Sequence, residues 1–403
     1  MEFTFLPRLP LAFSQLMLFG LLLVAGVVAG EMVRRYVGVP RIMGYVLAGA
    51  LLGPEATGLL DGDALFELRL LVDLGIGLVV FELGSRLDFE WLRRNHWLFA
   101  AALAESGLCF FAIYSGLSYF GFQPLLCATA AAIGTATSPA VVLLVSKDLQ
   151  SEGQVTERMI LFTAVNTVFA YMVLALLLPF LHLEHKADWR TALLHPVYVF
   201  AGAAITGWLA SLVLQRLARW VGKDRDRQFV LIASVVIVAI GLAHTLNLSV
   251  AVTLVTLGLA ARNFDRTHAL LPVDLGRGGE IFIVILFVLT GASLEFRAFG
   301  IAALGAVVAF VVLRFLGKAL GLLVFGRLSG IPAGGAGLLA LALLPMSGVA
   351  VVMVRDTVSL YPEFGRALGA IVLSAVVVLE LIGPLATQFA LRRAGEARPL
   401  VKR

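Results

Sequence analysis

Charged residues are scarce in this chain of 403 residues. Only 14% of the residues are Asp, Glu, Lys or Arg, whereas 60% are hydrophobic. Soluble domains are closer to a quarter charged and half apolar, so this composition excludes an ordinary soluble protein. The mean hydropathy of +0.97 points to the same class. We therefore predict an all-α polytopic membrane protein whose surroundings are a lipid bilayer.

Cysteine is also scarce, and the common motifs for metals and nucleotides are lacking. Cys109 and Cys127 both lie inside apolar segments, which excludes a disulfide framework and a cysteine-based metal site. The sequence contains no P-loop and no glycine-rich dinucleotide fingerprint. The histidines lie in loops or at segment ends without metal-ligand spacing: they are His96, His182, His185, His195, His244 and His268. We expect no metal, no cofactor and no enzymatic activity.

The apolar residues fall into runs that predict the membrane topology. Thirteen runs are long enough to cross a bilayer, at residues 11–33, 38–53, 68–84, 97–120, 122–146, 157–182, 191–218, 228–243, 247–262, 279–294, 297–327, 335–354 and 365–391. Every strongly basic loop follows an odd-numbered run. The positive-inside rule then places the N-terminus outside and the C-terminus in the cytoplasm. The net charge of +5 follows from these loops, so no nucleic-acid partner is expected.

Two of the runs are interrupted by polar residues and proline. Thr137-Ser138-Pro139 interrupts the fifth run, and Pro345-Met346-Ser347-Gly348 interrupts the twelfth. Proline removes a backbone donor, and irregular backbone at membrane depth is tolerated only where it is buried in protein or lines a wet cavity. The sixth run carries Asn166-Thr167 where an ordinary spanning helix carries Leu or Val. A broken helix beside a buried polar pair is typical of a transporter ion site.

The spacing of the two breaks predicts an internal repeat. They lie seven runs apart, so the two broken helices run in opposite directions through the membrane. Two inverted six-helix repeats with crossed broken helices are expected, at about 11–182 and 228–391, with residues 191–218 as a linker helix between them.

Several short stretches follow one another in an order that is typical of a known family. They are Gly38 to Tyr45, Phe81 to Asp88, Thr135 to Ser138, Phe287 to Gly291, Leu316 to Leu320, and Glu380 to Pro384 with the following Ala390 to Glu396. The chain thereby resembles the membrane domain of monovalent cation:proton antiporters, the sodium/hydrogen exchanger superfamily, and especially its NapA- and Kef-like branch.

The resemblance implies a fold, a location and partners. Residues 1–403 would form a single exchanger-like transmembrane domain without a soluble regulatory domain. The protein would be a homodimer in a bacterial inner (plasma) membrane, with an interface domain and a core domain that moves in an elevator-like step. Members of the family exchange Na⁺, K⁺ or Li⁺ for protons.

One departure from the family concerns the ion site itself. The helix after the first broken helix carries Asp-Asp, Asn-Asp or Gln-Asp in this family, whereas this chain has Asn166-Thr167 and no carboxylate there. Hard cations are usually held by carboxylate and carbonyl oxygens. An amide and a hydroxyl supply dipoles but carry no charge. The usual competition between a proton and a cation for one aspartate is therefore absent at this position.

Lys318 and a few polar residues are the remaining site candidates. Lys318 matches a lysine that pairs with the site aspartate in the NapA-like branch, and it is expected at the same depth as Asn166. It either changes its protonation state during transport or forms a permanent ion pair. Glu105 and Glu380 are the replacement carboxylates, and either could pair with Lys318 or Arg314. Glu380 is expected to be a structural partner, and Glu105 a proton carrier if any carboxylate has that role.

The hydroxyl groups at the breaks are candidate cation ligands. Thr137, Ser138 and Ser347 lie where freed carbonyls and half-helix ends meet, and these groups either bind a cation or satisfy one another locally.

We expect a secondary transporter that exchanges a monovalent cation for protons by alternating access. Two other classes stay open. The missing aspartate is also consistent with a transport-inactive relative that acts as a sensor or partner subunit, and a positively charged site would suit another, anionic solute. An enzyme is the least favoured class, because no nucleophile–base or metal constellation is visible.

Overall fold

The computed structural model describes residues 15–60, 62–184, 188–265, 269–271, 279–293 and 301–398. The regular structure of these residues is helical, without a strand among them. The first half of the chain forms α1 (Gln15–Met32), η1 (Val33–Val37), α2 (Arg41–Leu52), α3 (Gly62–Ser85), α4 (Phe89–Arg94), α5 (His96–Tyr119), α6 (Pro124–Thr135), α7 (Pro139–Asp148) and α8 (Gln154–Glu184). The second half forms α9 (Trp189–Val221), α10 (Arg225–Thr245), α11 (Val250–Asn263), α12 (Glu280–Ala292), α13 (Ile301–Phe325), η3 (Gly326–Ser329), α14 (Ala333–Ala342), α15 (Gly348–Leu360) and α16 (Pro362–Arg393).

The predicted apolar runs coincide with helices or with pairs of half-helices wherever the chain is described. Residues 11–14, 294 and 297–300 of these runs lie outside the described part. Within it, 8 helices are long and apolar enough to cross a membrane, with α6 and α7 taken as one, and α2, α11 and α12 are shorter apolar helices. The all-α, multi-pass architecture is confirmed, and the count of thirteen crossings stays a prediction.

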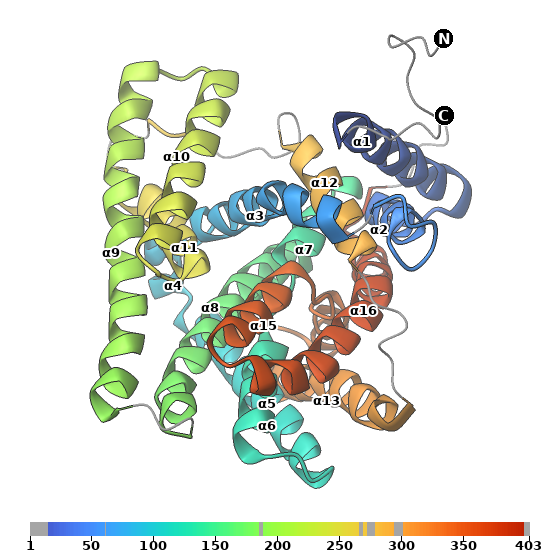
Figure 1. The fold of residues 1–403 in the computed structure, drawn as a ribbon, viewed down its shortest axis with the longest axis vertical. Helices are drawn as coiled ribbons and strands as arrows, with labels where there is room; N and C mark the ends of the chain where they lie inside the picture. The colour runs from blue at the N-terminus through green and yellow to red at the C-terminus, as the bar shows by residue number, and fades with distance from the viewer. Residues whose placement is uncertain are drawn as a thin grey trace, which may run out of the picture. The chain divides into compact units, whose positions relative to one another are not determined.

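The chain divides into two compact units. The first comprises the described parts of Met1–Val72 and Ile281–Glu295, and α1, α2 and α12 form its packed helices (Figure 1). Glycines let these backbones approach closely. A Cβ atom on Gly49 of α2 would lie 1.9 Å from the carbonyl oxygen of Val288 in α12. Small residues at helix contacts are the usual means of close packing in a membrane, where apolar burial offers little driving force.

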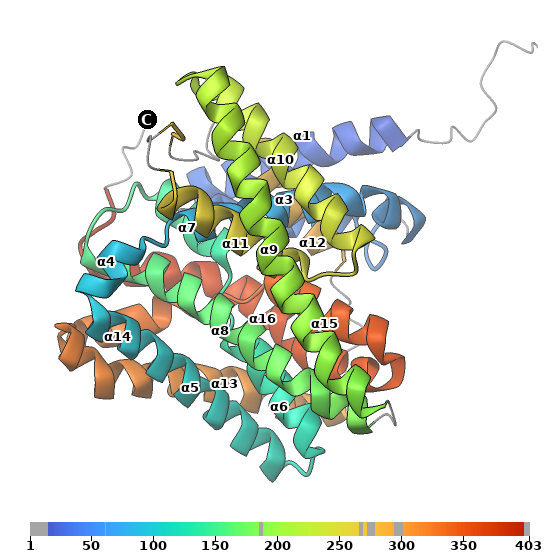
Figure 2. The same cartoon turned by 90° about the vertical axis from the view of Figure 1, so that its left-hand side faces the viewer.

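The second unit, Asp73–Glu280 with Phe296–Arg403, contains the two breaks. Within this unit α9 and α10 run side by side in both views (Figure 1 and Figure 2), and α11 packs against both. The helices α5 to α8 pack with α13 to α16 around the breaks.

Both predicted breaks are confirmed as interruptions of helical structure. The first covers residues 136–138 between α6 and α7, and the second covers residues 343–347 between α14 and α15. Pro139 itself is helical and forms the first turn of α7, where a missing N–H costs nothing. Its effect is on Ser138, which is extended (φ −70°, ψ 110°), as the residue before proline tends to be. The two breaks touch, because the Ser138 N–H donates to the Pro345 carbonyl at 2.9 Å.

Two glycines bring α5 and α13 into close contact. Gly317 and Gly321 are four residues apart on one face of α13. Added Cβ atoms would lie 2.6 Å from the Cα of Cys109 and 2.5 Å from the Cα of Glu105. This spacing is the small-xxx-small pattern of tightly packed membrane helices. The contact places Lys318, which follows Gly317, beside Glu105.

We predict that Gly321→Ala lowers the stability of the protein by about 1–3 kcal/mol, because the added methyl group forces two backbones apart. The measurement is thermal unfolding of the purified protein in detergent. Gly107→Ala, on α5, is the matched control, since nothing lies within 4 Å of the place that its Cβ would take. Equal melting temperatures for the two variants would contradict the prediction.

Candidate functional site

A fully buried ion pair lies at the centre of the second unit. The Lys318 ammonium donates to Glu105 Oε1 at 2.7 Å, and both side chains are completely buried. It also donates to the Thr135 carbonyl at 3.1 Å and to Thr137 Oγ1 at 3.3 Å. An ammonium group has three donors, so each one finds an acceptor. A buried pair is tolerated when additional hydrogen bonds satisfy the remaining protons and lone pairs.

Asn166 belongs to the same network. Its amide nitrogen donates to Thr137 Oγ1 at 3.2 Å and more weakly to Glu105 Oε1 at 3.4 Å. Its amide oxygen accepts from Ser106 Oγ at 2.8 Å. Lys318 and Asn166 therefore lie at the same level, as their expected depths suggested, but they meet through Glu105 and Thr137.

Arg314 holds the two breaks together through bonds to backbone carbonyls, and no carboxylate of the described residues pairs with it. Its Nε donates to the Gly134 carbonyl at 2.8 Å, and Nη1 donates to the Leu344 carbonyl at 2.6 Å. Nη2 donates to the carbonyls of Ala136, Leu343 and Pro345. The last carbonyls of a helix lack intrahelical partners and form the negative end of its dipole. The guanidinium satisfies these groups for both half-helices. Of the two cations that could pair with a replacement carboxylate, Lys318 and not Arg314 is the one that pairs with Glu105.

The hydroxyl groups at the breaks satisfy one another in this conformation. Ser138 Oγ lies 2.6 Å from Ser347 Oγ, and Thr137 Oγ1 donates to the Leu343 carbonyl at 3.2 Å. Gly348 begins α15 immediately after this contact. The candidate cation ligands are thus brought together from opposite ends of the sequence, with their hydrogen bonds directed at each other.

Thr167 faces a different direction from Asn166. Its hydroxyl donates to the Thr163 carbonyl at 2.8 Å and lies 3.4 Å from the Thr137 carbonyl oxygen. Successive helical residues are turned by about 100°. Thr167 therefore shares a face of α8 with Ala164 and Tyr171, whereas Asn166 is turned by about 100° from it, toward α5.

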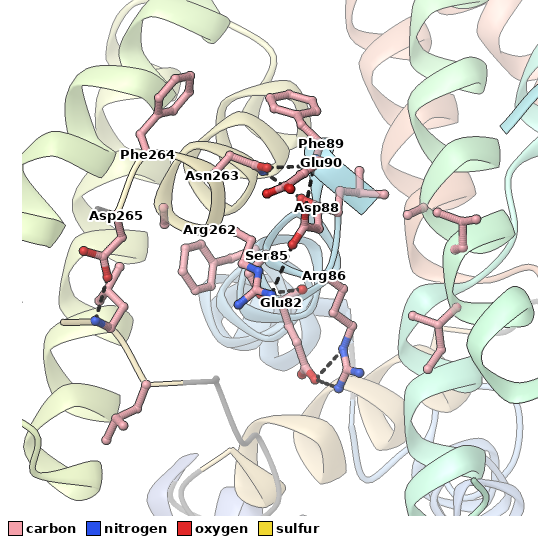
Figure 3. Close-up of a pocket in the computed structure, with 18 of the residues that line it drawn as sticks. Glu82, Ser85, Arg86, Asp88, Phe89, Glu90, Arg262, Asn263, Phe264 and Asp265 are labelled. Carbon is pink, nitrogen blue, oxygen red and sulfur yellow. Dashed lines mark hydrogen bonds and ion pairs between the residues drawn. The ribbon is translucent and has the colours of Figure 1, made fainter. Parts of the chain in front are cut away.

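A large cavity reaches this face of α8 from one end. It has a volume of about 840 Å³, and Ile160, Leu161 and Ala164 line its α8 side. Its polar side comes from the end of α3 and the end of α11, as Figure 3 shows. There the Arg86 guanidinium pairs with Glu82 at 2.6 Å, and the second carboxylate oxygen of Glu82 is buried without a hydrogen-bond partner.

A second cavity reaches the same face from the other end. It has a volume of about 300 Å³, and Tyr171, Leu174 and Leu178 line its α8 side. Asp73 and Arg355 also line this cavity, and their charged groups are 3.4 Å apart. Along α8 the two cavities are separated by the stretch between Ala164 and Tyr171, which is roughly 10 Å at about 1.5 Å per residue. Thr167 lies within that stretch, on the face that both cavities share.

Glu380 is placed differently from the expectation. It is completely buried in α16, and neither of its carboxylate oxygens has a hydrogen-bond partner among the residues that the structure describes. The expectation that it is a structural partner of Lys318 or Arg314 is therefore wrong, because Glu105 and backbone carbonyls occupy the donors of these two residues.

Three further titratable side chains gather at the C-terminal end of α8. His182 bonds to the Tyr361 hydroxyl and, through Nε2, to His195 Nδ1 at 2.9 Å. Burial raises the pKa of Tyr361. The sequence shows no spacing that links these residues, since they come from α8, the start of α9 and the turn between α15 and α16. No group of three or more metal-ligating side chains occurs in the described part of the chain.

The chain was also compared with known proteins. A search of curated proteins found no match. Solved structures of the sodium proton antiporter MjNhaP1 from Methanocaldococcus jannaschii are similar to it in fold. The structure at pH 8 has a TM-score of 0.63 at 16% identity, over 94% of this chain and 96% of that one. An electron-microscopy structure has a TM-score of 0.65 at 16% identity, over 94% of this chain and 98% of that one.

A family model shows which protein family the chain belongs to. The model described as "Sodium/hydrogen exchanger, transmembrane" matches residues 19–393, which is nearly the whole chain. This match agrees with the crossed breaks, the buried charges between them and the multi-pass helical architecture. The chain belongs to the sodium/hydrogen exchanger family of membrane transporters.

Proposed function

We propose that this protein exchanges a monovalent cation, Na⁺ or K⁺, for protons by alternating access. The observation that supports this function best is the pair of cavities that approach Thr167 from opposite ends of one α8 face. Family membership supports cation:proton antiport in general. An alternating-access transporter must let its site be reached from each side in turn, and the two cavities supply the two approaches.

The cation site that we propose lies between α8 and the first break. The Thr167 hydroxyl and the Thr137 carbonyl oxygen are 3.4 Å apart, and both are oxygen ligands of the kind that hard cations prefer. Ser138 and Ser347 offer further hydroxyl oxygens where the breaks meet. A bound cation replaces the hydrogen bonds among these groups, so the breaks must rearrange slightly as it enters.

In this proposal the Lys318–Glu105 pair is a permanent charge pair that positions the first break. All three ammonium donors are engaged, so a loss of the proton would leave at least one buried acceptor without its bond. The same geometry argues against an anionic substrate. Every side-chain nitrogen of Lys318 and Arg314 already donates to at least one acceptor, and an anion would have to displace these acceptors.

The proposed orientation places the large cavity on the cytoplasmic side of a bacterial inner membrane, because Arg86 and Arg262 line it and basic residues prefer that side. The repeats at 11–182 and 228–391 are supported by the matching order of helix, broken helix and helix in α5 to α8 and α13 to α16. A homodimer is expected from the family resemblance.

One prediction from the proposed function concerns the ion pair. Lys318→Met leaves Glu105 buried and unpaired, which should lower stability by about 3–5 kcal/mol and abolish exchange. Adding Glu105→Gln removes the unpaired charge, so the double variant should recover most of the stability and also measurable exchange. The measurements are thermal unfolding and cation-driven dissipation of a pH gradient in proteoliposomes. A stable double variant without exchange would show that the pair itself takes part in proton transfer.

Another prediction concerns the missing aspartate. Thr167→Asp adds a carboxylate to the proposed path and should lower the cation concentration for half-maximal exchange by about tenfold, equivalent to about 1.4 kcal/mol. Thr167→Asn is the uncharged control and should show no such gain. The readout is pH-gradient dissipation on addition of Na⁺, K⁺ or Li⁺. Exchange by Thr167→Asp together with none by the wild-type protein would favour a transport-inactive relative.

A further inference from the structure

Glu380 is the most unusual group in the second unit. Among the buried side-chain nitrogen and oxygen atoms of the described residues, only three lack a hydrogen-bond partner, and two of them are the carboxylate oxygens of Glu380. The third belongs to Glu82, whose other oxygen is paired with Arg86. Native proteins leave few such groups, and each requires an explanation.

Contacts of α16 place Glu380 beside the second break. Gly383 lies so close to the break that a Cβ there would be 2.7 Å from the Cα of Pro345. Thr387 donates to the Ala342 carbonyl at 3.1 Å. Gly383 and Thr387 follow Glu380 by three and seven positions, so the three residues share one face of α16. Glu380 therefore lies on the face that is directed at the break, one turn before Gly383.

The neighbouring half-helix adds a second feature. α15 and α16 are antiparallel neighbours, with Gly365 against Val358 and Gly383 against Pro345. Glu380 lies between these two contacts, close to the level where α15 begins. Ser347 is the N-cap residue of α15, immediately before Gly348. Its side chain makes no capping bond to α15, because its hydroxyl is directed at Ser138. The positive end of the α15 dipole therefore favours a negative charge nearby.

These features make both charge states of Glu380 accessible. An ionised carboxylate that is fully buried without partners is very unfavourable, so the group carries a proton in this conformation. A cation at Thr137 would lie next to Ser138, which contacts Ser347 and Pro345. A positive charge there would favour ionisation of Glu380, and the α15 dipole would stabilise the product.

The other charged groups near α16 do not compensate Glu380. Arg314 and Lys318 of α13 are engaged with carbonyls and with Glu105. Arg355 of α15 pairs with Asp73, and Asp356 lies one residue further along α15. Lys147 and Asp148 lie at the end of α7, and Cys127 is the titratable residue of α6. On α16 itself, the charged residues Glu363, Arg366, Arg392 and Arg393 lie near its two ends.

We propose that Glu380 carries the exchanged proton, in place of the aspartate that is missing at Thr167. This inference rests on the proposed exchange function. When the cation binds at the breaks, the O–H bond of the Glu380 carboxyl breaks and the proton leaves to water. When the cation leaves, the carboxylate takes a proton back. One positive charge enters as one leaves, so the net charge of the buried groups stays constant.

The test compares cation binding with proton release. Purified protein in detergent is titrated with NaCl or KCl against choline chloride in weakly buffered solution containing a pH indicator. Wild-type protein should release about one proton for each cation bound. Glu380→Gln should bind the cation without releasing a proton. Glu363→Gln, on an exposed turn of the same helix, should behave as wild type. Proton release by Glu380→Gln equal to that of wild type would overturn the inference.

A second measurement avoids dependence on a variant that folds poorly. Infrared difference spectra of the wild-type protein, recorded with and without the cation, should show loss of the C=O band of a protonated carboxyl group. An unchanged carboxyl band despite cation binding would overturn the inference. Wild-type protein that neither binds a cation nor exchanges one would instead overturn the proposed function, and the inference with it.

Discussion

The guanidinium of Arg314 is the interaction on which the rest of the second unit depends. Two half-helices, α6 and α14, end in the protein interior, where no water can satisfy their terminal carbonyls. Arg314 bonds to carbonyls of both ends at 2.6 to 3.4 Å. Its planar fork of five donors suits this task, whereas a lysine offers three donors from one point. Because Arg314 satisfies the carbonyls, the hydroxyls of Thr137, Ser138 and Ser347 can form the contacts between the two breaks. In the proposed function they can also contact the cation.

The buried charges divide into a fixed set and a variable one. Arg314, Lys318 and Glu105 are held by several hydrogen bonds each, so their charges are part of the structure. Glu380 has none, and its charge can change without disrupting a contact. In the proposed function, the path has no carboxylate at Thr167, and Glu380 supplies the group whose charge changes when the ion binds. The path itself would then be lined by neutral oxygens such as that of Thr167.

The sequence predicted much of the fold and part of the site. Long apolar runs and the polar interruptions at Ser138 and Ser347 are local signals, so the helices and both breaks were correctly placed. The partner of Lys318 was not predicted, because Glu105 and Glu380 have similar depth and only the rotation of each helix decides which one faces the lysine. The four-residue spacing of Gly317 and Gly321 indicates which face of α13 packs closely against another helix, and in the structure this helix is α5. The bonds of Arg314 to carbonyls could not be predicted from the sequence, because every residue has a backbone carbonyl.

The contact between the breaks has a mechanical consequence. The Ser138 N–H and hydroxyl bind Pro345 and Ser347, and Arg314 spans the same junction. A hinge that bent either half-helix alone would break several buried hydrogen bonds at once. Displacing both broken helices together with α13, which carries Arg314, as one rigid body would keep these bonds intact. Under the proposed exchange function, the least costly way to expose Thr167 to one cavity and then to the other would be for this body to slide along its neighbours, with the deformation confined to the loops that connect it.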